Sequence, residues 1–264
     1  MMMMMMRLLL VGLTALAVLV GDRVLANHVG TYRVVCYFTN WSQYRPSPAT
    51  FQPENIDPSL CTHIVFAFAV LNKRLQLIPH EWNDPDLYKR TFHTLNRTMN
   101  RPKLLLAVGG YKHGPVLLSK MAGNVYKRSQ FINQTVPYLR RYNFDGIELD
   151  WEFPGEINRG GRAVDKKNFP LMLEELRRAF DAESAVTKRP RLLLTAAVAA
   201  SSDLIDGGYD VKAIGSIVDY VTLMSYDYFG AWNNVAGHNA PLYEGYNQTA
   251  KYNVKWSVRK WLHE

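Results

Sequence analysis

Phe144-Asp145-Gly146-Ile147-Glu148-Leu149-Asp150-Trp151-Glu152 is a run in which acidic and apolar side chains alternate. In an extended strand alternate side chains share a face, so the last three carboxylates form a column with a spacing of about 7 Å. The opposite face carries Ile147, Leu149 and Trp151. A surface strand can carry acids too, but both faces of a strand in a parallel sheet are covered. We therefore predict that the apolar residues pack on helices and that the carboxylates face a lumen.

Short apolar runs alternate with longer helix-like segments on both sides of this strand. The predicted strands span residues 33–38, 63–70, 103–108, 146–152, 192–199 and 220–226. Apolar spacing predicts helices between them, at residues 86–99, 129–142 and 168–180. This alternation predicts a parallel sheet covered by helices, either doubly wound or closed as a barrel.

The residues that follow the strands favour the barrel. Polar, glycine and aromatic residues gather there, at Asn40-Trp41, Gly109-Gly110-Tyr111, Asp150-Trp151-Glu152 and Tyr226-Asp227. A barrel builds its site from many strand ends, whereas a Rossmann site has a glycine fingerprint after the first strand, which this sequence lacks. We predict an α/β fold of the (β/α)8 TIM-barrel type with about six β/α units present. Residues 252–263 are predicted to form the sixth helix, and two further units would need roughly 80 more residues, so we expect a barrel that stops before its seventh strand.

Residues 1–26 have the pattern of a secretory signal peptide. The positive charge of Arg7 precedes an apolar run over 8–20, and cleavage is expected near Ala26. The run is short for a permanent membrane span, and a membrane anchor is the alternative. We predict a secreted, extracellular protein that has no membrane segment after signal removal, with a single partial barrel domain at residues 27–264.

Secretion changes how the cysteines and several asparagines are interpreted. An oxidising compartment favours a disulfide between Cys36 and Cys61 over a metal site, which needs more ligands; two buried free thiols are the alternative. Four Asn-X-Ser/Thr sequons become plausible glycosylation sites at the protein surface. These begin at Asn40, Asn96, Asn133 and Asn247.

Composition narrows the classes of partner. The 264 residues are 48% hydrophobic, 12% aromatic and 20% charged, with a formal net charge of +8, which is typical of a packed soluble domain. The basic residues are scattered in pairs such as Arg140-Arg141, so a solvated face is favoured over nucleic-acid binding. No histidines have ligand spacing and no glycine loop could cradle phosphate, so neither a metal nor an organic cofactor is implied. The excess of aromatic rings indicates a ligand cleft.

The column of carboxylates indicates acid catalysis. Stacked acids in a poorly solvated place cannot all ionise near neutral pH, so at least one keeps its proton. Cleavage of a glycosidic bond requires a protonated acid beside an ionised one. Glu152 is last on the strand and is the expected donor; a purely structural acid cluster is the alternative.

These residues resemble a known family. The run 145–152 resembles the DxxDxDxE signature of family 18 glycoside hydrolases, the chitinases and chitinase-like lectins. Residues 36–46 resemble the first strand and loop of the animal secreted members. Segments 66–69, 106–110 and 224–227 resemble their second, third and sixth strands, so the match covers nearly all of residues 31–264.

The resemblance implies roles for individual residues. Glu152 matches the general acid/base, and Asp150 matches the acid that orients the substrate's acetamido group, whose oxygen attacks the anomeric carbon. Tyr226 and Asp227 match residues that hold the acetamido group and nearby sugar, and Glu148 completes the catalytic set. Further substrate contacts are expected from Tyr37, Phe68, Trp41, Gly109, Gly110, Tyr111, Met224 and Trp232.

Two residues depart from the family pattern. Glu148 stands where Asp is usual, so its longer side chain must fold back to reach Asp150, and Tyr111 stands where Trp is usual. The resemblance implies a chitinase that hydrolyses β-1,4 N-acetylglucosamine linkages with retention and binds chitin or chitooligosaccharides, its full-length form being a monomer. The alternative is a catalytically weak or inactive chitin-binding lectin, which the two departures favour.

Overall fold

The computed structural model describes residues 32–245 and 249–263, so the predicted signal peptide and Asn247 lie outside the described residues. The strands are β1 (Val35–Thr39), β2 (His63–Leu71), β3 (Leu77–Pro79), β4 (Lys103–Gly109), β5 (Gly146–Asp150), β6 (Leu193–Val198) and β7 (Tyr220–Leu223). The α-helices are α2 (Asp84–Leu95), α3 (Val116–Ala122), α4 (Val125–Arg141), α5 (Asp165–Thr187), α6 (Ser202–Gly208), α7 (Val211–Ile217) and α8 (Val254–His263). Short 3-10 helices occur at η1 (Asn40–Tyr44), η2 (Pro53–Asn55) and η3 (Ile157–Arg159).

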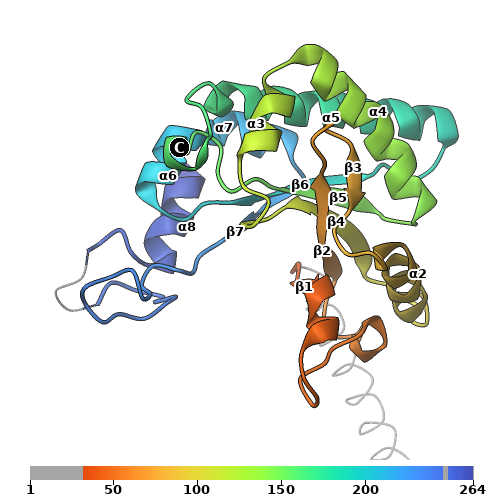
Figure 1. Cartoon of the computed structure of the whole chain (residues 1–264), viewed down its shortest axis with the longest axis horizontal. Helices are drawn as coiled ribbons and strands as arrows, with labels where there is room; N and C mark the ends of the chain where they lie inside the picture. Colours follow the sequence, from red (N-terminus) through yellow and green to blue (C-terminus); the bar gives the residue numbers. More distant parts are fainter. Residues whose placement is uncertain (1–31, 246–248, 264) are drawn as a thin grey trace, which may run out of the picture.

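The sheet is a curled row of parallel strands in chain order. Its path is β1-β2-β4-β5-β6-β7, with β3 pairing antiparallel to β2 as a side hairpin. Figure 1 shows the sheet curving between β1 and β7, with α3, α4 and α5 over its outer face. Parallel strands joined by helical crossovers give this layered arrangement, which is a partial (β/α) barrel.

The two faces of the strands pack as the alternating sequence predicts. Ile147, Leu149 and Trp151 are fully buried in the main core, together with apolar residues of α3, α4 and α5. A smaller cluster from β2 and β4, centred on Val65 and Leu105, forms a separate core. Glu148 and Asp150 are buried as well, at 0% and 4% exposure. The prediction that the apolar set of this strand packs on helices is confirmed.

The curl brings the beginning of β7 close to the beginnings of β1 and β2. The Tyr220 ring lies 5.5 Å from the His63 ring, centroid to centroid. The guanidinium carbon of Arg33, just before β1, is 5.3 Å from the centroid of the same Tyr220 ring. These contacts between sequence-distant strands help to set the curvature of the sheet.

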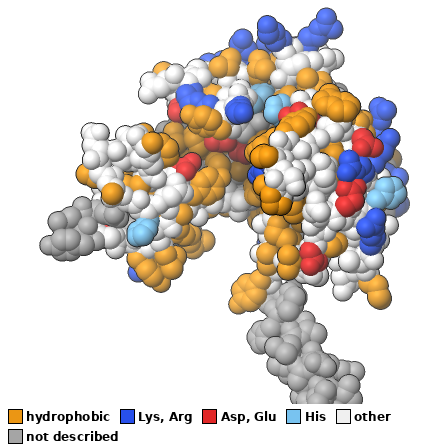
Figure 2. All heavy atoms as spheres, turned by 60° about the horizontal axis from the view of Figure 1, so that its bottom comes forward, with side chains coloured by type: hydrophobic (Ala, Val, Ile, Leu, Met, Phe, Trp, Pro, Cys, Tyr) orange, Lys and Arg blue, Asp and Glu red, His pale blue; other side chains and the backbone are white. Residues whose placement is uncertain are grey.

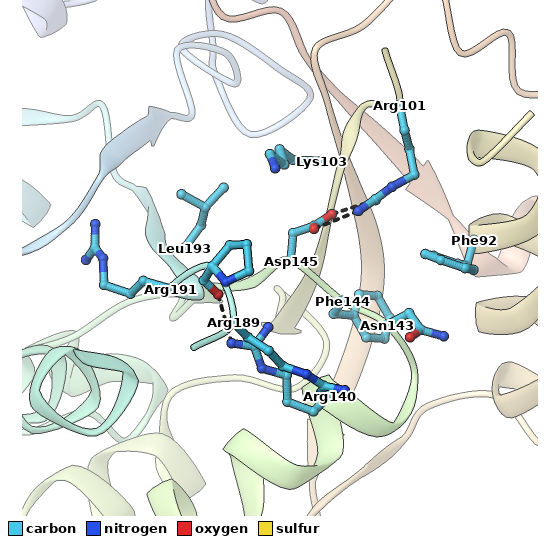
Figure 3. Close-up of a pocket in the computed structure, with 11 residues that line it drawn as sticks. Phe92, Arg101, Lys103, Arg140, Asn143, Phe144, Asp145, Arg189, Arg191 and Leu193 are labelled. Atoms are coloured by element: carbon cyan, nitrogen blue, oxygen red, sulfur yellow. Dashed lines mark hydrogen bonds and ion pairs between the residues drawn. The ribbon is translucent and has the colours of Figure 1, made fainter. Parts of the chain in front are cut away.

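Ion pairs join the elements at the amino ends of the strands, and Figure 3 shows one of them, between Arg101 and Asp145, beside a cavity of about 350 Å³. Arg101, before β4, donates to both carboxylate oxygens of Asp145, before β5, at 2.6 and 2.8 Å. Arg140 of α4 donates to Glu183 of α5 at 2.9 Å through Nε. Arg140, expected on a solvated face, therefore ties two helices together.

Cys36 of β1 and Cys61, just before β2, form a disulfide, as the sequence predicts. The bond closes a separation of 25 residues. Restricting the unfolded chain in this way contributes roughly 3 kcal/mol to stability in the loop-entropy account. The bond fixes β1, which lies at one end of the sheet.

The sequon at Asn40 is not a surface position, contrary to the sequence-based expectation. Asn40 is fully buried, and its amide donates to Asp84 Oδ1 at 2.9 Å. That carboxylate also accepts the backbone N–H groups of His80 and Glu81, so the Asn40 amide belongs to a buried polar network. Asn96 and Asn133 are exposed and remain predicted glycosylation sites.

The remaining differences from the predicted elements are local. β5 ends at Asp150, so Glu152 lies in the following loop and not on the strand. The β3 hairpin and the short helices α3, α6 and α7 were not predicted, because their segments are too short to show a clear period. Within residues 32–245 and 249–263, no helix is both long and apolar enough to cross a bilayer.

Candidate active site

The site lies at the carboxyl ends of the parallel strands. Asp150 ends β5 and Glu152 follows two residues later, while Glu148 lies two residues before Asp150 on the same strand. Figure 2 shows a hollow in the surface with acidic side chains deep inside it and hydrophobic side chains around it. The predicted column of carboxylates is therefore present, with its upper member nearest the solvent.

Glu148 is held by hydroxyl groups from three other strands. Its Oε2 accepts the Tyr37 hydroxyl of β1, and its Oε1 accepts Thr195 of β6 at 3.2 Å and Thr222 of β7 at 2.8 Å. Burial raises the pKa of Glu148, while these three hydroxyls lower it. The expectation that Glu148 folds back to Asp150 is wrong, because its two oxygens face these hydroxyls. Tyr37, a predicted substrate contact, donates its hydroxyl to Glu148.

Asp150 has an unpaired oxygen inside the site. Its Oδ1 is buried without a hydrogen-bond partner among the described residues. Burial, with the charges of Glu152 and Glu148, raises the pKa of Asp150 well above its usual value. A buried polar atom without a partner is costly unless a ligand or water satisfies it. Asp150 therefore keeps one acceptor oxygen unused beside Glu152.

The glycine pair after β4 allows the strand ends to approach each other. Gly109 and Gly110 have φ angles of +120° and +86°. A Cβ on Gly109 would lie 2.1 Å from the Asp150 carbonyl oxygen, and one on Gly110 would lie 2.9 Å from the Phe68 ring. Gly110 donates its N–H to the Asp150 carbonyl at 2.8 Å. Only glycine fits here, so the pair positions Asp150 as well as lining the cleft.

Glu152 is half-buried, and burial raises its pKa to about 7. The charge of Arg159 lowers the pKa, Asp227 and Glu156 raise it, and the Tyr111 backbone N–H lowers it. A carboxyl group with a pKa near neutrality can act as a proton donor at pH 7. A pKa near 7 is what the predicted role of Glu152 as the acid requires.

Aromatic side chains line two adjoining cavities above the carboxylates. The first, of about 500 Å³, contains Trp41, Phe68, Gly109, Gly110 and Tyr111. The second, of about 700 Å³, contains Tyr111, Glu152, Met224, Tyr226, Asp227 and Trp232. The Trp41 and Phe68 rings are stacked, with centroids 5.8 Å apart. The predicted substrate residues, apart from Tyr37, thus line these two spaces.

The far wall of the second cavity is the segment after β7. Burial and the nearby acids raise the pKa of Tyr226 to about 12, so this hydroxyl is a hydrogen-bond donor at neutral pH. Asp227 has φ +59° and accepts the Asn239 amide at 2.9 Å. The Asn239 contact fixes the orientation of Asp227 beside Tyr226.

Sequence reasoning missed several residues of this site. Thr195 and Thr222, the partners of Glu148, lie in predicted strands, and the inward phase of those strands could have indicated them. Arg159 ends the three-residue 3-10 helix η3, and Asn239 lies in the irregular segment after β7; neither stretch has a periodic pattern that indicates which way a side chain points.

Barrel glycoside hydrolases use an acid held protonated beside a second acid at the carboxyl edge of the strands, and this site has that arrangement. The family model for glycosyl hydrolases family 18 matches residues 33–264, and the chain belongs to this family. Chitotriosidase-1 of Mus musculus is 40% identical over 233 residues, an alignment covering 87% of this chain and 49% of the relative. Oviduct-specific glycoprotein of Sus scrofa is 40% identical over 221 residues, with 83% and 41% coverage. The chain thus spans about half or less of these curated relatives.

Solved structures give the same assignment. A chitinase from Trichuris suis, described as immunomodulatory and active, superposes with a TM-score of 0.82 at 37% identity, covering 88% of this chain and 62% of that one. Human YKL-39, described as a pseudo-chitinase that retains chitooligosaccharide binding, superposes with a TM-score of 0.80 at 34% identity, covering 88% and 63%. The predicted family and barrel fold are confirmed. The relatives include active and inactive proteins.

Proposed function

We propose that this chain carries the acid-bearing part of a secreted chitinase that cleaves β-1,4 N-acetylglucosamine linkages with retention. The observation that carries the proposal is Glu152, half-buried with a pKa of about 7, above the buried Asp150 with its unpaired oxygen. Glu152 donates its proton to the leaving glycosidic oxygen. The disulfide supports an oxidising, extracellular environment.

Asp150 and Tyr226 then act on the substrate's acetamido group. In the proposed reaction the acetamido oxygen attacks the anomeric carbon as the glycosidic bond breaks, which makes this family an exception to the use of two carboxylates. The free Oδ1 of Asp150 accepts the acetamido N–H and stabilises the positive charge that forms. The Tyr226 hydroxyl donates to the acetamido group from the other wall of the cleft. The attack by the acetamido oxygen forms a cyclic oxazolinium ion, and Glu152 later activates the water that opens this ring.

The product anomer tests the proposal. A tetramer of N-acetylglucosamine incubated with the full chain should release product that is initially the β-anomer, as followed by proton NMR. Retention is expected because attack and hydrolysis each invert the same carbon. Initial release of the α-anomer would contradict the mechanism. Saturable binding without consumption would instead support the lectin described next.

A chitin-binding protein without turnover is the second candidate, and the environment of Glu148 favours it. Glu148 is engaged by Tyr37, Thr195 and Thr222, which leaves Asp150 without a carboxyl partner for proton sharing. The aromatic walls would still bind sugar in that case. The presence of Glu152 favours the hydrolase.

The activity should depend on pH through Glu152. The acid form is the active one, and the raised pKa preserves that form up to about pH 7. We expect kcat/KM to fall about tenfold per pH unit well above this pH. An unshifted glutamate, with a pKa of about 4.3, would lose activity some three units lower. Rates with a fluorogenic chitooligosaccharide from pH 4 to 9 measure this decrease of kcat/KM, and circular dichroism checks that the chain stays folded. A decrease centred near pH 4 to 5 would contradict the assignment of Glu152 as the acid.

A further inference from the structure

Tyr111 separates the two cavities of the cleft. Of the described residues that line these cavities, it alone belongs to both. Its side chain is 65% exposed, so few neighbours restrain the ring. A sugar chain that occupies both cavities must pass this ring, and a wall with a fixed orientation binds better than one that must first be ordered.

Arg159 restrains Tyr111 through both its ring and its backbone. The guanidinium carbon lies 3.9 Å from the centroid of the Tyr111 ring. Its Nη2 donates to the Tyr111 carbonyl oxygen, and its Nη1 donates to the Glu152 carbonyl oxygen at 3.0 Å. One planar group thus joins the loop after β4 to the loop after β5. Arginine suits this task because its fork of donors is rigid and its face stacks on aromatic rings.

Buried contacts fix the loop that carries Arg159. Asp165 is fully buried and accepts the Arg162 N–H at 2.7 Å and the Ser119 hydroxyl at 2.7 Å. Gly160, directly after Arg159, has φ +89°, and a Cβ there would lie 2.8 Å from Val116. The Arg159 backbone is therefore anchored to α3 and α5. The Arg159 side chain is 25% exposed and extends from this anchored segment to Tyr111.

We propose that Arg159 is a positioning residue that holds Tyr111 as the fixed partition of the cleft, so that chitooligosaccharides spanning both cavities bind across the free face of the ring. The proposal rests on the proposed function for the identity of the ligand. Tyrosine offers a smaller ring than the tryptophan usual at this position, so its alignment depends more on a support. Arg159 thereby acts on long substrates more than on short ones.

The first test needs no sugar. In the full chain, Arg159→Met keeps an unbranched apolar stem and removes the guanidinium. We expect backbone amide exchange, followed by mass spectrometry, to become about tenfold faster in residues 110–114, equivalent to about 1.4 kcal/mol. The control is Arg178→Met on α5, where the side chain is 66% exposed and its only described ion pair is with Glu174. Exchange that is unchanged in Arg159→Met would overturn the positioning role, whatever the chain binds.

The second test measures binding by calorimetry in the Glu152→Gln background, where cleavage does not interfere. We expect Arg159→Met to lower the affinity for the pentamer of N-acetylglucosamine about tenfold and the affinity for the dimer less than about threefold. The affinities of Arg159→Lys should lie between those of wild type and Arg159→Met. When Tyr111→Ala is already present, adding Arg159→Met should lower the pentamer affinity less than about twofold, because Arg159 acts on binding through the Tyr111 ring. Additive losses, or equal losses for both ligands, would overturn the proposal. If no oligosaccharide binds the background variant, the proposed function fails and amide exchange alone decides the role of Arg159.

Discussion

Replacing Glu152 with glutamine is expected to lower kcat by about 10²–10⁴-fold, the usual loss when a general acid is removed. The amide has nearly the shape of the protonated carboxyl, so it fills the same place beside Arg159 and Tyr111 but cannot deliver a proton. Substrate binding should change little, because the loss falls on the transition state. Initial rates on a fluorogenic chitooligosaccharide, with kcat and KM determined separately, show whether kcat falls while KM stays nearly unchanged.

Two controls separate chemistry from folding. Glu174→Gln makes the same change on an α5 side chain that is 53% exposed and should leave the rate unaltered. Glu152→Gln should also be no less stable than wild type at pH 8. The folded pKa of about 7 lies above the unfolded value of about 4.3, so ionising Glu152 destabilises the fold at that pH, and the neutral amide avoids this cost. Equal turnover by the Glu152→Gln and wild-type chains would remove Glu152 from the mechanism.

The sequence predicted the fold well where side chains alternate with a clear period. The acidic and apolar faces of β5 are those expected, since a strand in a covered parallel sheet has only two environments to fill. The end of β5 was less predictable, and Glu152 lies beyond it. Periodicity does not indicate where backbone pairing stops.

The sequence predicted which residues belong to the candidate site better than it predicted which of them touch each other. Glu148 was expected to meet Asp150, its neighbour along the same face, yet it binds hydroxyls from β1, β6 and β7. Those partners become neighbours only when the sheet curls, which a linear pattern does not specify. Asn40 shows the same limit, because its sequon indicates exposure while Asp84, distant in sequence, draws it into the interior.

The hydroxyl network around Glu148 leads to the second large effect. Replacing Glu148 with alanine should lower the free energy of unfolding by about 3 kcal/mol, because it removes the acceptor shared by three hydroxyl groups and each of these hydrogen bonds contributes about 1 kcal/mol. Tyr37 and Thr222 belong to β1 and β7, the two ends of the sheet path, so the same carboxylate links both ends to its middle strand. Urea unfolding followed by intrinsic fluorescence measures the change.

The glutamine variant distinguishes hydrogen bonding from charge. In Glu148→Gln the amide oxygen can still accept Thr195 and Thr222, while the amide nitrogen can donate to the Tyr37 oxygen, reversing that one bond. We therefore expect the unfolding free energy of Glu148→Gln to lie within about 1 kcal/mol of wild type, and that of Glu174→Ala, a change at an exposed position of α5, within about 0.5 kcal/mol. If the glutamine variant were as unstable as the alanine variant, the negative charge and not the hydroxyl network would hold the strands. If neither variant were destabilised, water entering the lumen would satisfy the three hydroxyls, and the curl of the sheet would depend on its outer helices and on the contacts of Tyr220 with His63 and Arg33.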